Sequence, residues 1–188
     1  MTTRTAPKTK KTTTTTTKKK KSTTTAATTK RPPARWRLAT SADRRAIIAM
    51  SLGLFSEDPG TFTLTARDVG RTLSTFEREP VRGCAVVVED EVDGRDGVVG
   101  YAFLCSFWSN ELRGEVCTVD ELFIDDAVRG RGLGSDLVRQ LVEQRRFFPR
   151  AVGFELEVTP GNTRARALYE RLGFRPRKNA TLRLLRAG

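Results

Sequence analysis

The stretch that most constrains the fold of this chain is VDELFIDDAVRGRGLG, residues 119–134. It continues an apolar run that carries two adjacent acids, Asp120 and Glu121, and this run predicts a largely buried β-strand over residues 116–124. A basic turn with three glycines follows, and apolar residues then recur at helical spacing over residues 133–142. The sequence therefore predicts a strand, a glycine-rich turn and the start of an amphipathic helix, in that order.

The predicted turn has the properties of an anion-binding site. The first N–H groups of a helix lack intrahelical partners and the helix dipole is positive at this end, so the turn suits a phosphate or a diphosphate. A P-loop is excluded because it ends in Gly-Lys-Ser/Thr and this turn has no lysine. A dinucleotide fingerprint is excluded because its third glycine would fall on Ser135 or Leu137. The pattern that remains is Arg129-x-x-Gly132-x-Gly134.

This pattern resembles the diphosphate-binding signature of the GNAT family of N-acetyltransferases, Arg/Gln-x-x-Gly-x-Gly/Ala. A second stretch, NTRARALYERLGF at residues 162–174, is similar to the family's Asn…Ala…Tyr-Glu-x-x-Gly-Phe segment. The resemblance covers residues 36 to about 188 and is nearest to diamine acetyltransferase-like members, because VDELFI and Tyr169 look like their pattern. It implies an α/β (mixed α+β) fold, the acyl-CoA N-acyltransferase fold, in which helices flank a central mixed β-sheet.

The resemblance also implies a function and a carrier. The expected activity is transfer of an acetyl group from acetyl-CoA, the cosubstrate, to a primary amine of a small cationic molecule, directly in a ternary complex and without a metal. In this family the turn holds the diphosphate, here with Arg129 and Arg131 adding mobile charge, and the preceding strand holds the pantetheine arm. The residues implied to contact acetyl-CoA are Leu122, Phe123, Ile124, Arg129, Gly130, Arg131, Gly132, Leu133, Gly134 and Asn162.

Asp120, Glu121 and Tyr169 are the candidates for the proton transfers of such a reaction. An amine like that of lysine is protonated at neutral pH, so the acceptor needs a base or a proton relay. Residues alternate across a strand, so the two acids are expected on opposite faces, with only one of them in the acceptor site. The resemblance favours Asp120, nine residues before the signature arginine, with Glu121 as the second candidate. Tyr169 is implied as the acid that protonates the leaving thiolate, although its helical spacing alone would make it a core residue.

The rest of the chain from residue 36 shows alternating strand and helix signals. Capping boxes at Thr40–Asp43 and Thr65–Asp68 predict two helix starts, and Asn162 is expected to cap the last helix. An acidic hairpin loop is expected at residues 89–97. The predicted strands are residues 36–39, 84–88, 98–107, 116–124, 152–158 and a closing strand at 181–185, and the last helix is predicted over residues 162–172.

The beginning of the chain differs in composition from the remainder. We expect a disordered Thr/Lys-rich basic tail at residues 1–34 and a single domain at 35–188. The formal net charge is +12 and residues 1–35 carry eleven basic groups and no acid, so the remainder is close to neutral. The tail is expected either to be solvated without a partner or to make weak, salt-sensitive contact with a polyanion. An organellar transit peptide fits less well, because the apolar residues of an amphipathic helix are missing.

The tail also raises an alternative function, a non-catalytic acyl-CoA-binding protein anchored to nucleic acid or to an anionic surface. No run is long and apolar enough for membrane insertion and no secretory signal is seen, so the expected location is cytoplasmic. Cys84, Cys105 and Cys117 lie in or beside apolar runs and are expected to be buried, reduced thiols. The chain has no histidine and no CxxC pair with which to build a zinc site. The resemblance also allows a homodimer, since dimers are common among related enzymes.

Overall fold

The computed structural model describes residues 34–57, 59, 62–92, 95–179 and 181–185. Its centre is a five-stranded sheet whose strands lie in sequence order. The strands are β1 (Arg35–Leu38), β2 (Gly83–Val92), β3 (Arg95–Ser109), β4 (Gly114–Ile124) and β5 (Ala151–Leu156). The first three pairs are antiparallel and the pair β4–β5 is parallel, so the sheet is mixed, as expected.

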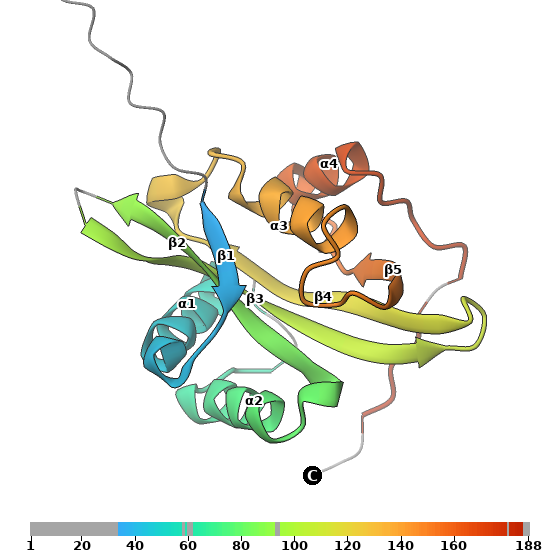
Figure 1. Ribbon diagram of the computed structural model, residues 1–188, viewed down its shortest axis with the longest axis horizontal. Helices are drawn as coiled ribbons and strands as arrows, with labels where there is room; N and C mark the ends of the chain where they lie inside the picture. The colour runs from blue at the N-terminus through green and yellow to red at the C-terminus, as the bar shows by residue number, and fades with distance from the viewer. Residues whose placement is uncertain (1–33, 58, 60–61, 93–94, 180, 186–188) are drawn as a thin grey trace, which may run out of the picture. The chain divides into compact units, whose positions relative to one another are not determined.

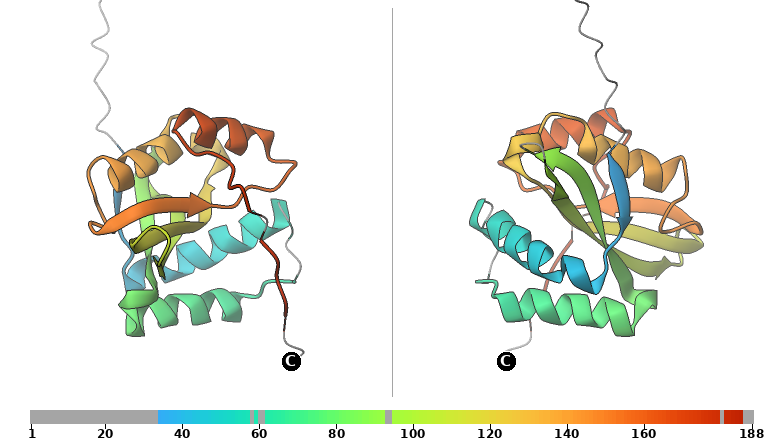
Figure 2. Two further views of the ribbon diagram at one scale, coloured as in Figure 1. Left: turned by 90° about the vertical axis from the view of Figure 1, so that its right-hand side faces the viewer. Right: turned by 60° about the vertical axis from the view of Figure 1, so that its left-hand side comes forward.

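Helices cover both faces of this sheet (Figure 1). They are α1 (Arg44–Glu57), α2 (Ala66–Arg78), α3 (Leu133–Val142) and α4 (Thr163–Arg171). The first two pack on one face and the last two lie on the other, and Figure 2 shows the same layers from the side. Short 3-10 turns precede or follow these elements: η1 (Ser41–Asp43), η2 (Pro80–Arg82) and η3 (Asp126–Val128).

The expected helix caps are present in the structure. The backbone N–H of Thr40 donates to Asp43 at 2.7 Å before α1, and that of Thr65 donates to Asp68 at 3.1 Å before α2. The Asn162 side chain accepts from the backbone N–H of residue 165 at 3.0 Å and so caps α4. Each cap satisfies a backbone donor that the helix itself leaves without a partner, which fixes where these helices begin.

Apolar residues alternate along β2 and divide the interior into two cores. Val86 and Val88 belong to the core under α3, whereas Ala85 and Val87 belong to the core under α1 and α2. Successive strand residues point to opposite faces, so one strand contributes to both cores. Full burial of an apolar side chain of this kind stabilises a fold by about 1.5–3 kcal/mol. The two cores therefore fix the sheet between its two helical layers.

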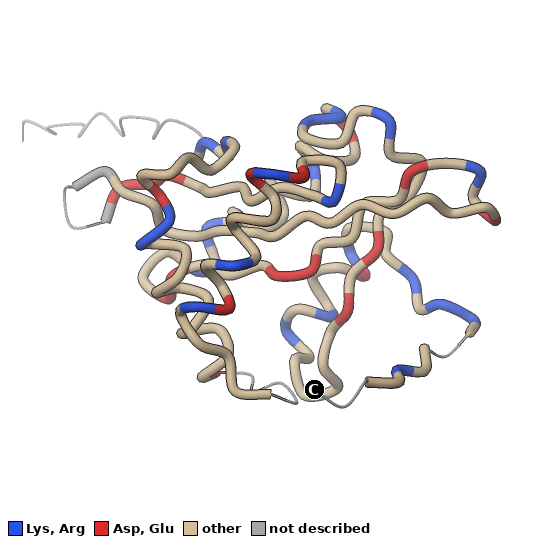
Figure 3. The backbone as a smooth tube through the Cα atoms, turned by 90° about the horizontal axis from the view of Figure 1, so that it is seen from below, with Lys and Arg blue, Asp and Glu red and all other residues tan. Residues whose placement is uncertain are grey.

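A β-bulge interrupts the β3–β4 pairing at the two acids. Phe103 pairs with Glu121 and Leu104 pairs with Val119, which leaves Asp120 as an extra residue without a partner on β3. Phe103 belongs to the α1–α2 core and Val119 to the α3 core, so the register directs both acids to the α1–α2 face. The expectation that they lie on opposite faces was wrong, because simple alternation fails across a bulge. Figure 3, viewed from the α1–α2 side, shows acidic positions in the central part of the molecule.

Strands β4 and β5 separate beyond the bulge. Their last pair is Val119 with Leu156, so residues 120–124 have no partner on β5. An unpaired strand edge presents backbone N–H and C=O groups that another extended molecule can bind. The separation therefore creates a binding edge immediately before the glycine-rich turn.

Two predicted elements differ from the structure. Strands β2 and β3 pair as far as Val92 and Arg95, so most of the expected hairpin loop at 89–97 is strand; residues 93–94 lie outside the described residues. The expected closing strand is not formed over residues 181–185, where Leu182 and Leu184 are 94% and 96% exposed. Alternating leucines do not define a strand when neither face of the segment is buried. The predicted tail lies outside the described residues, apart from residue 34.

The described residues contain neither a candidate membrane span nor a candidate metal cluster. None of the helices in the described ranges has the length and apolarity that a bilayer crossing requires, and no group of three potential metal ligands occurs there. All three cysteines are free, Cys117 buried and Cys84 and Cys105 half-buried. Burial raises the pKa of each thiol, to about 12 for Cys84 and about 11 for Cys105, so these thiols stay protonated at neutral pH.

Candidate functional site

The glycine-rich turn depends on backbone angles that favour glycine. Gly130 and Gly132 have φ values of 84° and 86°, in the left-handed region. A Cβ atom on Gly132 would meet nothing within 4 Å, so glycine is needed there for its conformation and not for space. The turn delivers the chain into α3, where the N–H of Asp136 donates to the Gly132 carbonyl at 2.9 Å.

The first turn of α3 presents free backbone donors. The N–H groups of Leu133, Gly134 and Ser135 precede the first intrahelical bond and have no partner within the helix. The helix dipole adds a partial positive charge at the same place. These groups have the properties that the predicted anion-binding site requires.

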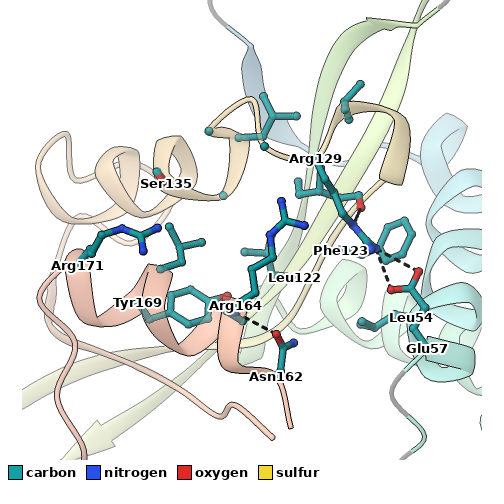
Figure 4. Close-up of a pocket in the computed structure, with 18 residues that line it drawn as sticks. Leu54, Glu57, Leu122, Phe123, Arg129, Ser135, Asn162, Arg164, Tyr169 and Arg171 are labelled. Carbon is teal, nitrogen blue, oxygen red and sulfur yellow. Dashed lines mark hydrogen bonds and ion pairs between the residues drawn. The ribbon is translucent and has the colours of Figure 1, made fainter.

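A pocket of about 390 Å³ lies between this turn, the end of β4 and α4 (Figure 4). Its volume is within the usual range for small-molecule sites, about 300–1,000 Å³. The predicted residues that line it are Leu122, Phe123, Ile124, Arg129, Gly130, Gly132, Leu133, Gly134, Asn162 and Tyr169. Asp120, Glu121 and Arg131 were also predicted as site residues, but they do not line this pocket.

The side chain of Arg129 is held by protein groups. Its guanidinium donates to both Glu57 oxygens at 2.9 and 3.1 Å, and it also forms an ion pair with Asp126. Its Nε donates to the Ile124 carbonyl at 2.7 Å, and the group lies 5.3 Å from the centre of the Phe123 ring. The prediction that Arg129 adds mobile charge was therefore wrong. Its visible role is to tie the turn to the end of α1.

The side chain of Arg131 is directed away from the pocket. It contacts Asp90 at 3.4 Å and donates to the carbonyls of Glu91 and Ala127 at 3.4 and 3.2 Å. The prediction that Arg131 adds mobile charge was therefore also wrong. The signature contributes its backbone, while its two arginine side chains brace the turn.

Two arginines on α4 supply the charge that the signature arginines do not. Arg164 and Arg171 line the pocket, and Figure 4 shows both side chains extending from α4 into it. The Arg164 guanidinium comes within 3.9 Å of the place that a Cβ on Gly130 would occupy. In the described part of the chain, neither arginine has a hydrogen-bond or ion-pair partner. Sequence reasoning missed both, although their separation of seven residues, two helical turns, was a usable signal.

Tyr169 lies on the pocket wall, as predicted. Its ring meets Phe174 edge-on at 5.7 Å, and the side chain is half-buried. Burial raises the pKa of the Tyr169 phenol, so it is protonated at neutral pH. Its hydroxyl has no hydrogen-bond partner among the described residues, which leaves it able to donate to a bound molecule.

Glu121 lies behind the pocket, on the α1–α2 side of β4. Its Oε2 accepts from the Tyr101 hydroxyl at 2.6 Å and from the Ser51 hydroxyl at 3.2 Å. Burial is the largest influence on its pKa and raises it, with a further rise from Asp120, while the two hydroxyls oppose the shift. Glu121 is thus an acid whose ionised form is destabilised by its surroundings, as a proton acceptor in an enzyme often is.

Asp120 has a more open setting on the same strand. Its side chain is exposed to solvent, yet enough protein surrounds the carboxyl for desolvation to raise its pKa. The charge of Glu157 adds to this rise and the charge of Arg183 opposes it. Among the described residues, Asp120 has no hydrogen-bond partner that fixes its carboxyl, so its position depends on the bulge alone.

Comparisons with known proteins agree with this geometry. Residues 53–174 match the model of the acetyltransferase (GNAT) family. The mycothiol acetyltransferase of Beutenbergia cavernae is 30% identical over 138 residues, which are 73% of this chain and 43% of that protein. The aminoglycoside N(6')-acetyltransferase type 1 of Klebsiella pneumoniae is 35% identical over 68 residues, 36% of this chain and 34% of that protein. The chain therefore spans less than half the length of either relative.

A solved structure shares the fold. The crystal structure of a possible acetyltransferase from Clostridium difficile 630 superposes with a TM-score of 0.69 at 19% identity. The match covers 82% of this chain and 99% of that one. The sheet and its flanking helices therefore belong to a shared fold.

Proposed function

Because this chain belongs to the acetyltransferase (GNAT) family, we propose that it is an acetyl-CoA-dependent N-acetyltransferase that acetylates a primary amine of a small cationic molecule. The observation that carries the proposal is the pocket, which joins a free helix N-terminus to an unpaired edge of β4. A diphosphate fits the first and an extended, amide-containing arm fits the second. Acetyl-CoA has both groups, and it supplies the acetyl group as a thioester.

The chain's own residues divide the binding of this carrier between backbone and side chains. The N–H groups of Leu133, Gly134 and Ser135 bind the diphosphate, and Arg164 and Arg171 neutralise its charge from across the pocket. The unpaired edge of β4 at residues 122–124 aligns the arm. Arg129 contributes indirectly, by holding the turn in place.

We assign one proton transfer to β4 and the other to α4. A carboxylate of β4 removes the proton of the acceptor ammonium, and the Tyr169 hydroxyl gives a proton to the leaving sulfur. The raised pKa of Tyr169 suits this role because the phenol is fully protonated before the reaction. None of the three cysteines lines the pocket, which supports direct transfer from carrier to amine without a covalent acyl-enzyme.

We place the acceptor on the α1–α2 face of β4, where acidic groups lie close together. The charges of Asp120 and Glu121 both raise the pKa of Cys105, the charge of Asp120 raises the pKa of Glu121, and the charge of Glu157 raises the pKa of Asp120. A concentration of carboxylates attracts a cationic amine. One relative is named for N-acetylation of an aminoglycoside, which agrees with an amine acceptor. Diamines are the finer proposal, because the pattern around Asp120 is nearest to that of diamine acetyltransferases.

Calorimetric titration with acetyl-CoA tests the proposal. We expect saturable binding by the wild type and a loss of affinity of about tenfold in Gly132→Val, because a β-branched residue is strained in the left-handed region. Gly132→Asn is the matched control, since asparagine tolerates this region better. A screen for thiol release over a diamine, an aminoglycoside and glucosamine then names the acceptor class. Absence of acetyl-CoA binding by folded wild type contradicts the proposal, and binding without any thiol release supports a non-catalytic acyl-CoA-binding protein.

A further inference from the structure

The Glu121 carboxylate is held by two buried hydroxyls from distant parts of the chain. Ser51 comes from α1 and Tyr101 from β3, and both side chains are 0% exposed. They donate to the same carboxylate oxygen, Oε2. A serine in the middle of an apolar helix face and a tyrosine in the core each need a polar partner, and Glu121 serves both. The other carboxylate oxygen has no hydrogen-bond partner among the described residues.

An aromatic cluster keeps the Tyr101 hydroxyl in place. The Tyr101 ring meets Phe103 at 5.1 Å and stacks on Phe123 at 6.3 Å, and Phe76 meets Phe103 edge-on at 5.7 Å. Rings packed in this way have little freedom to reorient. Because burial and the charge of Glu121 raise the pKa of Tyr101, its hydroxyl remains a donor across the physiological pH range.

The network adjoins the pocket on the side where the acceptor is placed. Phe123 lines the pocket, and Glu121 lies two residues before it on the same face of β4, a distance of about 7 Å along the strand. Leu54 lines the pocket from α1, and Ser51 lies one helical turn before it. Strand β4 and helix α1 therefore each carry a residue of the pocket wall close to a residue of the network.

We propose that Glu121 is the residue that accepts the proton of the substrate ammonium, and that Tyr101 and Ser51 are positioning residues that aim its carboxylate. This inference rests on the proposed function and goes beyond it by choosing between the two acids. Asp120, in contrast, has no hydroxyl partner in the described part of the chain. Both hydroxyls bind Oε2, so the proposal assigns the other carboxylate oxygen, which has no hydrogen-bond partner among the described residues, to the amine.

The proton step is a simple transfer. One N–H bond of the ammonium breaks and one O–H bond forms on Glu121, which leaves a neutral amine with its lone pair and a neutral carboxylic acid. The acid returns the proton to solvent before the next cycle. The titratable groups around Glu121 are Asp120 beside it on β4 and Tyr101 and Cys105 on β3, while α1 presents Ser51. Of these, only Asp120 changes charge near the pH at which Glu121 titrates.

The test is the pH dependence of kcat/KM for thiol release with the best amine of the screen, using the full chain. Removal of a donor to the ionised carboxylate raises its pKa, so Tyr101→Phe is expected to move the acidic limb of the profile upward by about one pH unit. Ser51→Ala should move the limb in the same direction by less, because its hydroxyl lies farther from the carboxylate. Ser56→Ala, an exposed serine on the same helix, is the matched control and should leave the limb in place.

The outcomes separate this inference from the proposed function. A limb that stays in place in Tyr101→Phe and Ser51→Ala, or one that disappears in Asp120→Asn and persists in Glu121→Gln, overturns the inference while the enzyme remains. If wild type binds acetyl-CoA but acetylates no amine, the proposed function fails instead. The carboxyl titration of Glu121, followed by carbon-13 NMR in wild type and Tyr101→Phe, then decides the positioning alone, because an unchanged titration would contradict it.

Discussion

Asp43, just before α1, and Glu121, on β4, are two carboxylates whose pKa values are moved in opposite directions. The Arg37 guanidinium donates to Asp43 at 2.7 and 2.9 Å and lowers the pKa of Asp43 from 3.8 to about 2. Glu121 receives only neutral hydroxyl donors, so burial prevails and raises its pKa. Asp43 is only 6% exposed, so burial alone does not decide the direction.

The difference shows what distinguishes a structural carboxylate from one that can act on a proton. A guanidinium partner stabilises the ionised form and keeps the group an anion at every physiological pH. Hydroxyl partners orient the group but leave its charge only partly compensated. The ion pair at Asp43 therefore stabilises the fold, whereas β4 retains at Glu121 a group that gains from taking up a proton.

Activity should show the largest contrast between the two positions. Glu121→Gln removes the proton acceptor and is expected to lower kcat/KM about 10²- to 10⁴-fold, the usual contribution of general base catalysis. Asp43→Asn alters a group far from the pocket and should retain most of the activity. Thiol release under saturating acetyl-CoA is the measurement. Equal losses in the two variants would contradict the division of roles.

Stability should show the opposite order, with the larger loss in the Asp43 variant and not in the Glu121 variant. Asp43→Asn is expected to lower the free energy of unfolding by about 2 kcal/mol at neutral pH, because the folded state loses a favourable ionised group. Glu121→Gln should leave stability unchanged or raise it, since an acid with a raised pKa in the folded state is unfavourable when ionised. Urea unfolding of both variants beside wild type measures this. A strong destabilisation by Glu121→Gln would instead indicate a structural role for that residue.

The pH dependence of stability sharpens the same comparison. An acid with a lowered pKa stabilises the fold above its ordinary pKa, and this contribution is lost as the pH falls toward the folded value. For Asp43 the loss is therefore expected between about pH 4 and pH 2. The difference in unfolding free energy between wild type and Asp43→Asn should shrink across this window. A difference that stays constant from pH 5 downward would show that the ion pair with Arg37 contributes little.

The smallest expected effect concerns two arginines, of which one is held by ion pairs and the other is not. Arg129 is paired with Glu57 and Asp126, whereas Arg164 has no partner in the described residues. Arg164→Gln should weaken acetyl-CoA binding about three- to tenfold at low salt, and less at high salt because exposed charges are screened. Arg166→Gln, on the same helix but outside the pocket, is the control. Calorimetry at two salt concentrations measures the change, and equal effects of the two variants would remove Arg164 from the site.

The glycine-rich turn, which we propose as the carrier side of the site, could be predicted from the sequence because its shape depends largely on backbone. The spacing of Gly132 and Gly134 encodes a left-handed turn and a helix start, and both are local properties of a few residues. The order of strands and helices was predictable for the same reason. The side chain of Arg129 was not, because its partner Glu57 lies 72 residues away in the chain.

The hydrogen-bond network around Glu121 could not be predicted because it depends on contacts between distant elements. Ser51 and Tyr101 meet Glu121 only after α1, β3 and β4 have packed together, at separations of 70 and 20 residues. The bulge at Asp120 changes the face of every residue after it, and no local signal announced it. The prediction of a closing strand at 181–185 was wrong for a related reason, because alternation in a sequence does not provide a neighbouring strand.

The most direct test of this account is a carbon-13 NMR titration of the Asp43 and Glu121 side-chain carboxyls in one wild-type sample, with signals assigned by Asp43→Asn and Glu121→Gln. The account predicts that Asp43 titrates near pH 2 and that Glu121 titrates above its ordinary value. A Glu121 carboxyl that titrates at or below its ordinary value would contradict the account, because such a group would be a fixed anion like Asp43.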